Sequence, residues 1–142
     1  MSHVFLISGA SRGLGRAIVE AALAAGHHVV AGVRSVSALD DLAAREPERL
    51  AVVPLDVTDD EQVRSAIDTA IQRWGRLDVL VNNAGYANMA AVEDVDVDDF
   101  RAQVETNFFG VVRLTQAVLP IMRRQRAGHI VQISSVGGRL AR

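Results

Sequence analysis

Five short apolar runs, each closed by small or polar residues, recur along the chain and limit the folds that it can adopt. The runs are continuous rather than alternating, which is typical of strands that are buried on both faces of a parallel sheet. We predict five such strands, over residues 4–7, 28–33, 50–53, 77–81 and 129–133.

Helical patterns fill the stretches between the runs. Residues 14–25 are rich in alanine and leucine and stop at Gly26, which predicts a left-handed C-terminal cap. The stretch from Thr58 to Glu61 is typical of a capping box, and apolar residues at helical spacing follow it up to Trp74 and Gly75.

A third, longer helix is expected from about Asp98 to Arg126, with a bend at Gly110 or Pro120. Its apolar stripe recurs at helical spacing. The residues of this stripe are Phe100, Val104, Phe108, Val111, Leu114, Val118 and Met122.

Strands that alternate with helices require crossover connections, and right-handed crossovers place helices on both faces of a parallel sheet. The 142 residues, 49% of them hydrophobic, suffice for one such domain. We therefore predict an α/β fold with a doubly wound sheet of five parallel strands in the order 3-2-1-4-5. A flavodoxin-like sheet in the order 2-1-3-4-5 fits the same elements and is the weaker alternative.

The charge and the composition argue against several classes of partner. A net charge of −2 without a basic cluster predicts neither nucleic acid nor an anionic membrane as a partner. No apolar run approaches membrane-spanning length, and the N-terminus has no signal-peptide pattern. The chain has no cysteine, so we expect no disulfides and no metal site, and a cytoplasmic location.

A glycine-rich loop, Ser8 to Gly15, separates the first predicted strand from the first predicted helix. Backbone N–H groups at such a helix N-terminus favour a pyrophosphate. Gly9 would form the tight turn, Gly13 would let the backbone approach a ligand, and Gly15 would let the helix pack on the strand. The spacing G-x-x-x-G-x-G by itself fits an ordinary strand-to-helix turn equally well.

This loop closely resembles the T-G-x-x-x-G-x-G motif of the short-chain dehydrogenase/reductase family, with Ser8 in place of the usual threonine. Four further matches follow in the family's order along the whole chain. They are the pair Asp56-Val57, the motif Asn82-Asn83-Ala84-Gly85, Asn107 after Thr106, and Ile133-Ser134-Ser135 at the end of the fifth strand. Taken singly, the asparagines also fit structural roles, in a turn or in a local helix bond.

The resemblance implies a Rossmann-type NAD(P)-binding domain, over residues 1–142, of an oxidoreductase that moves a hydride between nicotinamide and a secondary alcohol or ketone. It also implies a set of cofactor contacts from the glycine loop and from the loops after the next three strands. These residues are Ser8, Gly9, Ser11, Arg12, Gly13, Leu14, Gly15, Arg34, Asp56, Val57, Asn83, Ala84 and Gly85.

The end of the second predicted strand bears on the choice between NAD and NADP. Folds that select NAD place an acid there, whereas the 2′-phosphate of NADP requires arginine. The sequence Gly32-Val33-Arg34-Ser35 has no acid, and Arg12 of the glycine loop can approach the same phosphate as Arg34. We expect NADP(H) rather than NAD; the alternative is that both arginines are solvated surface charges.

By resemblance, Ser135 would orient the substrate carbonyl, with Ser134 as the less favoured choice, and Asn107 would hold a proton-relay water. The family's catalytic tyrosine and lysine would fall near position 148. The given sequence has no lysine, and its single tyrosine, Tyr86, has Ala90 at i+4. We therefore expect no turnover from these 142 residues alone, and Tyr86 would line the substrate side of the nicotinamide pocket or simply pack.

The resemblance further implies that the C-terminal part of the family fold is missing from this sequence. The fifth strand would then present an unpaired apolar edge that is liable to aggregation or self-pairing. From the apolar stripe between Phe100 and Met122, on a helix that family members commonly use for subunit pairing, we expect a homodimer or homotetramer. The alternative function is a non-catalytic nucleotide-binding module or a degenerate family member. An in-frame Tyr-x-x-x-Lys beyond codon 142 would favour the enzyme over that alternative.

Overall fold

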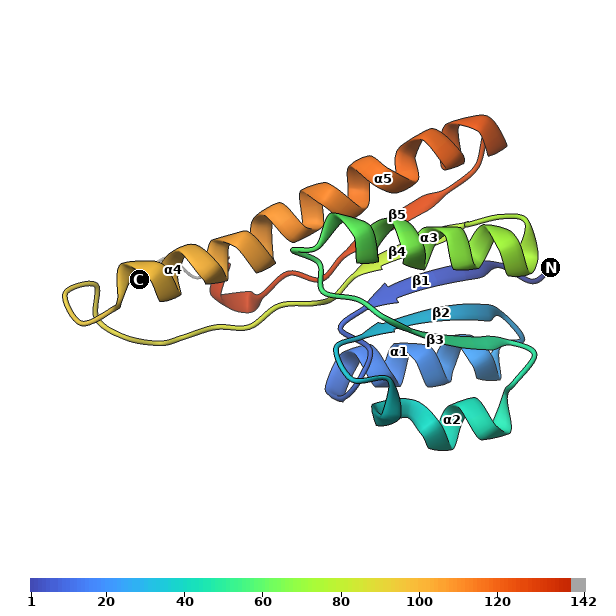
Figure 1. Ribbon diagram of the computed structural model, residues 1–142, viewed down its shortest axis with the longest axis horizontal. Coiled ribbons are helices and arrows are strands. Elements are labelled where there is room, and N and C mark those ends of the chain that lie inside the picture. Colours follow the sequence, from blue (N-terminus) through green and yellow to red (C-terminus); the bar gives the residue numbers. More distant parts are fainter. Residues whose placement is uncertain (139–142) are drawn as a thin grey trace.

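A five-stranded parallel sheet with the strand order β3-β2-β1-β4-β5 runs through the middle of the computed structural model, which describes residues 1–138 (Figure 1). Its strands are β1 (Val4–Ser8), β2 (His28–Val33), β3 (Leu50–Pro54), β4 (Val79–Asn82) and β5 (His129–Gln132). Its α-helices are α1 (Gly13–Ala24), α2 (Asp40–Arg45), α3 (Asp60–Trp74), α4 (Val97–Val104) and α5 (Gly110–Gln125). This order confirms the predicted doubly wound sheet and excludes the flavodoxin-like alternative.

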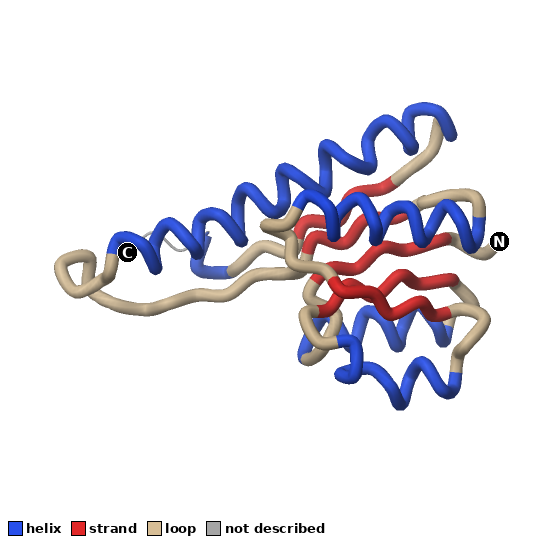
Figure 2. The backbone as a smooth tube through the Cα atoms, viewed as in Figure 1, coloured by secondary structure: helices blue, strands red, loops and turns tan. Residues whose placement is uncertain are grey.

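The helices cover the sheet from both sides, with α1 and α2 on one face and α3 and α5 on the other (Figure 2). Successive strand residues point to opposite faces, so Leu6 of β1 packs under α3 and α5 while Ile7 packs under α1 and α2. Both side chains are fully buried. This arrangement explains why β1 to β4 appear as continuous apolar runs, because side chains of each of these strands pack in both cores. β5, which was also predicted to be buried on both faces, is mostly exposed and contributes only Ile130 to the core under α3 and α5.

Several element boundaries differ from the predicted ones. β3 continues to Pro54, which an edge strand tolerates because one side of β3 has no partner strand in the sheet. β4 covers 79–82 rather than 77–81. The prediction missed a short 3-10 turn, Val36–Leu39, and α2, because their two buried anchors, Leu39 and Leu42, are too few to give a periodic pattern.

The N-terminal cap of α3 is a correction to the predicted capping box. Asp59, not Thr58, is the cap: its carboxylate accepts the backbone N–H groups of Glu61 and Gln62. The N–H of Gln62 and then that of Glu61 hold the pKa of Asp59 below its ordinary value. At the other ends of the helices, Gly26 and Gly75 have the positive φ angles, 82° and 71°, that a left-handed cap requires.

The predicted long helix is present, but a π-helical turn, Glu105–Phe109, divides it into α4 and α5. The irregular turn adjoins Gly110, whereas the helix continues through Pro120. The expected apolar stripe divides at the same place: Leu114, Val118 and Met122 are buried, whereas Phe100, Val104 and Phe108 are exposed. Figures 1 and 2 show why, because α4 and the start of α5 extend past the end of the sheet.

The amino ends of β1 and β4 are joined by a buried carboxylate. Asp78 accepts the backbone N–H of Val4 at 2.9 Å and three hydrogen bonds from Arg76 at 2.7–3.0 Å. Burial alone would raise the pKa of Asp78, but the hydrogen bonds from Arg76 and from Val4 outweigh it and keep this pKa below its ordinary value.

β5 lies at one edge of the sheet and pairs only with β4 among the strands of residues 1–138. Val131 on this strand and Ile133 just after it remain partly exposed, at 42% and 39%. The expected open apolar edge is therefore present in the part of the chain that the structure describes. In the same part, no helix has the length and the apolar character needed to cross a membrane.

Candidate functional site

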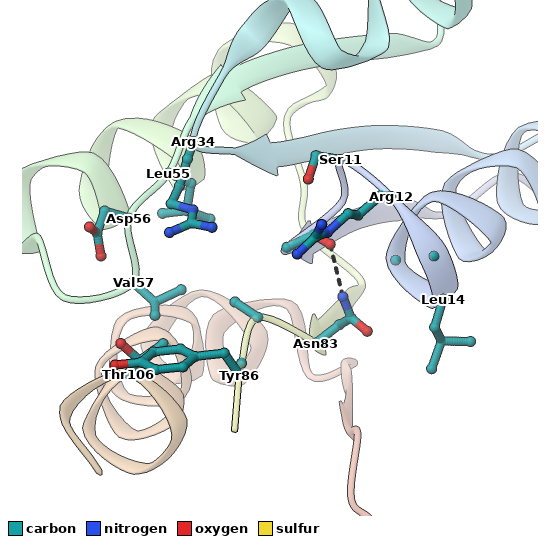
Figure 3. A pocket seen from close by; sticks show the side chains of 15 residues that line it. Ser11, Arg12, Leu14, Arg34, Leu55, Asp56, Val57, Asn83, Tyr86 and Thr106 are labelled. Atoms are coloured by element: carbon teal, nitrogen blue, oxygen red, sulfur yellow. Dashed lines mark hydrogen bonds between the residues drawn. The ribbon is translucent and has the colours of Figure 1, made fainter. Parts of the chain in front are cut away.

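The loops that follow β1, β2, β3 and β4 meet at the carboxyl edge of the sheet and surround one cavity of about 720 Å³ (Figure 3). Twelve of the thirteen predicted cofactor contacts line it. Its lining consists of Gly9, Ser11, Arg12, Gly13, Leu14, Gly15, Arg34, Leu55, Asp56, Val57, Asn83, Ala84, Gly85, Tyr86 and Thr106. Ser8 is the predicted contact that is not part of the lining.

The glycines of the loop after β1 allow two loops to touch. A Cβ atom on Gly15 would lie 2.2 Å from the carbonyl oxygen of Gly9 and 2.5 Å from Nδ2 of Asn83. Gly9 has a φ of 65°, and a Cβ there would lie 2.7 Å from the Cα of Ala84. Only glycine fits both positions, so the loop after β1 packs directly on the loop after β4.

Ser8 and Asn83 hold these two loops together. The Ser8 hydroxyl oxygen accepts the backbone N–H groups of Asn83 and Ala84, both at 3.0 Å, and Nδ2 of Asn83 donates to the carbonyl oxygens of Ser8 and Gly9, both at 3.0 Å. Figure 3 draws the bond between Asn83 and Gly9. Ser8 is 1% exposed, so it supports the loops that line the cavity without being part of the lining itself.

The N-terminus of α1 is open to an anion. Arg12 at its cap position makes no side-chain capping bond, and its first turn has no acidic residue. By contrast, α3 and α4 begin with the capping carboxylates Asp59 and Asp96 and carry further acids in the first turn. The first-turn N–H groups of α1 and its positive dipole end therefore face the cavity, and no carboxylate among the described residues 1–138 caps them.

Two arginines approach the cavity from different loops. Arg12 follows β1 and Arg34 follows β2, and Figure 3 shows both side chains at the cavity. Both are exposed, and no carboxylate within residues 1–138 forms a salt bridge with either of them. These guanidinium groups are therefore available to an anionic ligand.

The loop after β3 supplies the wall that faces Arg34. Oδ1 of Asp56 accepts both the backbone N–H and the hydroxyl of Thr58, at 2.9 and 2.7 Å, which fixes the turn. The next residue, Val57, is buried against Gly110 of α5: a Cβ atom on Gly110 would lie 2.4 Å from Cγ2 of Val57. The long helix thus lies directly against this wall.

Asn107 lies in the π turn, beside the cavity rather than in its lining. Its Oδ1 accepts the backbone N–H of Tyr86 at 3.0 Å, and its Nδ2 donates to the carbonyl oxygen of Tyr86 at 2.6 Å. An amide has two lone pairs and two protons, so Asn107 keeps capacity for one more bond on each side. Tyr86 itself lines the cavity and is 43% exposed, and its place on the substrate side of the nicotinamide stays a prediction.

Ser135 lies just after β5, outside the lining. Parallel pairing of β5 with β4 places Gln132 beside Asn82, so the segment that carries Ser135 starts at the same edge of the sheet as the loop that carries Asn83. Its hydroxyl oxygen accepts the backbone N–H of Gly137 at 3.1 Å. The orienting role of Ser135 stays a prediction.

Sequence reasoning missed two lining residues, Leu55 and Thr106. Each is adjacent to a residue that the motifs did identify, Asp56 and Asn107. Leu55 also explains Gly32, because a Cβ atom there would lie 2.3 Å from Cδ2 of Leu55. No cluster of three or more potential metal ligands occurs within residues 1–138.

A family model described as short chain dehydrogenase matches residues 3–142. An oxidoreductase of Botryotinia fuckeliana, BOA17, is 54% identical over 141 residues, which cover 99% of this chain and 52% of that protein. A sepiapterin reductase of Chlorobaculum tepidum is 37% identical over 146 residues, covering 96% of this chain and 60% of the relative.

Among solved structures, a short-chain dehydrogenase from Streptomyces avermitilis superposes with a TM-score of 0.93 at 46% identity. The match covers 99% of this chain and 52% of that one. The chain therefore spans about half the length of these relatives.

Proposed function

This chain belongs to the short-chain dehydrogenase family, and we propose that the protein that contains it transfers a hydride between NADP(H) and a carbonyl compound or secondary alcohol. The observation that carries the proposal is the cavity at the carboxyl edge of the sheet. Four loops, an uncapped helix N-terminus and two arginines without carboxylate partners among residues 1–138 converge there.

The residues present fit a dinucleotide with a 2′-phosphate. The glycine loop and the first turn of α1 would hold the pyrophosphate, since the open N–H groups suit an anion. Arg12 and Arg34 would hold the 2′-phosphate, and Asp56 with Val57 would contact the adenine. The residues where β2 ends support NADP over NAD, because no acid there repels the phosphate.

When bound, the nicotinamide supplies the hydride for reduction or takes it up for oxidation. Ser135 would donate a hydrogen bond that orients the substrate oxygen, and Asn107 would hold a water that carries protons to and from the site. Proton donation itself requires an acid placed on that oxygen, and the family uses a tyrosine with a neighbouring lysine. Residues 1–142 contain no such pair, so we propose that they bind the cofactor without turning it over.

Titration calorimetry with the full protein tests the cofactor proposal. We expect NADPH to bind more tightly than NADH, Arg34→Gln to reduce that difference, and Arg34→Asp to favour NADH. Arg45→Gln is the matched control, because Arg45 is also an exposed arginine but lies outside the cavity. Equal affinities of the unmodified protein for the two cofactors would contradict the proposal.

The alternative is a nucleotide-binding module without catalysis. It is favoured by the absence of a Tyr-x-x-x-Lys motif from residues 1–142. Oxidation of NADPH by the full protein with a panel of ketones separates the two: turnover supports the enzyme, and binding without turnover supports the module.

One feature of the surface and one of the composition support further proposals. Phe100 and Val104 of α4 and Phe108 of the π turn are exposed apolar residues beyond the end of the sheet, and they support a homodimer or homotetramer. The absence of cysteine from the chain is consistent with a cytoplasmic location.

A further inference from the structure

Arg113 of α5 joins the π turn that carries Asn107 to a second helix. Nη2 of Arg113 donates to a carboxylate oxygen of Glu105, the first residue of the turn. Nε of the same side chain lies 3.3 Å from Oδ1 of Asp60, the first residue of α3. A single guanidinium group therefore links the π turn, α5 and α3.

The π turn needs such a link because apolar burial does not hold it. None of its five residues is buried, and Phe108 and Phe109 are 59% and 46% exposed. A π turn is intrinsically rarer than an α turn. Relaxation to the α-helical register would shift the turn by one residue, a rotation of about 100°, and would carry the Asn107 side chain away from Tyr86.

The position of Arg113 also matters for the cavity. Asp60 follows the wall formed by Asp56 and Val57, and Gly110 packs directly on Val57. Thr106, which neighbours Glu105, lines the cavity from the π turn. The bridge from Glu105 through Arg113 to Asp60 thus connects two walls of the same cavity.

We propose that Arg113 is a positioning residue for Asn107: by holding Glu105 and Asp60 together it keeps the π turn in the register in which Asn107 binds the backbone of Tyr86. The catalytic part of this inference rests on the proposed function. Removal of an ion pair that has no positioning role should leave the contact of Asn107 with Tyr86 unchanged. The pair of Arg101 with Asp98 on α4 is an example, since its side chains are 74% and 87% exposed and belong to neighbouring turns of one helix.

Hydrogen exchange at the backbone N–H of Tyr86 tests the geometry directly in the full protein, with or without catalysis. Asn107→Ala removes the acceptor of this N–H and sets the upper limit of exchange. We expect Arg113→Met to raise the exchange rate toward that limit, by about tenfold, and Arg113→Lys to restore part of the protection. Arg101→Met is the matched control and should leave the rate unchanged. An unchanged rate in Arg113→Met overturns the proposal.

Kinetics test the consequence for catalysis. We expect Arg113→Met to lower kcat by about 10- to 100-fold, with the affinity for NADPH altered less than twofold. In an Asn107→Ala background the same substitution should lower kcat no further, because Arg113 acts through Asn107. An equal, additive loss in both backgrounds overturns the proposal.

The proposal can still be tested if Arg113→Met does not fold or if the proposed function is wrong. If Arg113→Met does not fold, Glu105→Met removes the oxygen that accepts this bond while keeping a side chain of similar length, and the same exchange result is expected. If the unmodified protein neither binds NADPH nor reduces any carbonyl, the proposed function fails. The exchange rate of Tyr86 still decides whether Arg113 positions Asn107.

Discussion

Replacing Ser8 by alanine removes one oxygen atom from the junction between the carboxyl ends of β1 and β4. That oxygen accepts the N–H groups of Asn83 and Ala84 and donates to the carbonyl of Val81, at 3.4 Å. Ser8 is 1% exposed, so solvent does not reach the vacated acceptor position. A buried donor without a partner costs about 1–3 kcal/mol. In Ser8→Ala two half-buried donors, the N–H groups of Asn83 and Ala84, lose their acceptor, so we expect the free energy of unfolding to fall by about 2–4 kcal/mol.

Urea unfolding followed by circular dichroism measures this loss. With a typical dependence of about 2 kcal/mol per molar urea, the midpoint should fall by about 1–2 M. Ser35→Ala is the matched control, because the Ser35 hydroxyl is exposed and bonds to the Ser37 hydroxyl at 3.1 Å; its effect should stay within about 0.5 kcal/mol. Ser8→Thr keeps the oxygen and should lose less than Ser8→Ala.

A loss below about 1 kcal/mol for Ser8→Ala would refute the reasoning. It would mean that strand pairing alone holds the two loops in place. The affinity for NADPH provides a second reading of the same variant. It should fall together with stability, because the N–H groups released from Ser8 belong to the loop that lines the cavity.

Three further predictions concern pH, activity and assembly. Because the pKa of Asp78 is lower in the folded state than its ordinary value of about 3.9, its carboxylate stabilises the fold above that pH and the contribution is lost as the pH falls through the folded pKa. Asp78→Asn should therefore cost about 1 kcal/mol at pH 7 and flatten the loss of stability below pH 4, as measured by urea unfolding; an unchanged acid profile would contradict this. Residues 1–142 expressed alone should oxidise no NADPH with a ketone panel, whereas the full protein should; equal rates would contradict this expectation. Sedimentation at high micromolar concentration should show at least a dimer of the full protein and a smaller species for Phe108→Asp, which changes an exposed apolar side chain; a monomer of the unmodified protein would contradict the proposed assembly.

Strands β1 to β4 could be predicted from the sequence because each is an apolar run whose side chains pack in both cores. Leu6 and Ile7 are neighbours in sequence and lie in different cores, which is why the run does not alternate. The roles of Gly9 and Gly15 could also be predicted from the sequence. Neither position has room for a side chain, so glycine is required there and appears in the motif.

Two features that the sequence did not predict, the π turn and the contacts of the Ser8 hydroxyl, depend on residues outside their own segment. The π turn is fixed by bonds from Asn107 to Tyr86 and from Glu105 to Arg113, and no local pattern marks it. In the same way Ser8 fits the motif as a cofactor contact, but its hydroxyl is occupied by backbone groups 75 and 76 residues away. Composition and periodicity describe one element at a time and cannot contain such pairings.

The strand order has a consequence for how the chain folds as it is synthesised. β1 is made first and lies in the centre of the sheet; β2 is made next and pairs beside it, and β3 pairs with β2. β4 then pairs with the other side of β1, and β5 pairs with β4. Each strand that leaves the ribosome after the first therefore finds its partner strand already made. The growing sheet adds strands only at its edges and never inserts a later strand between two earlier ones.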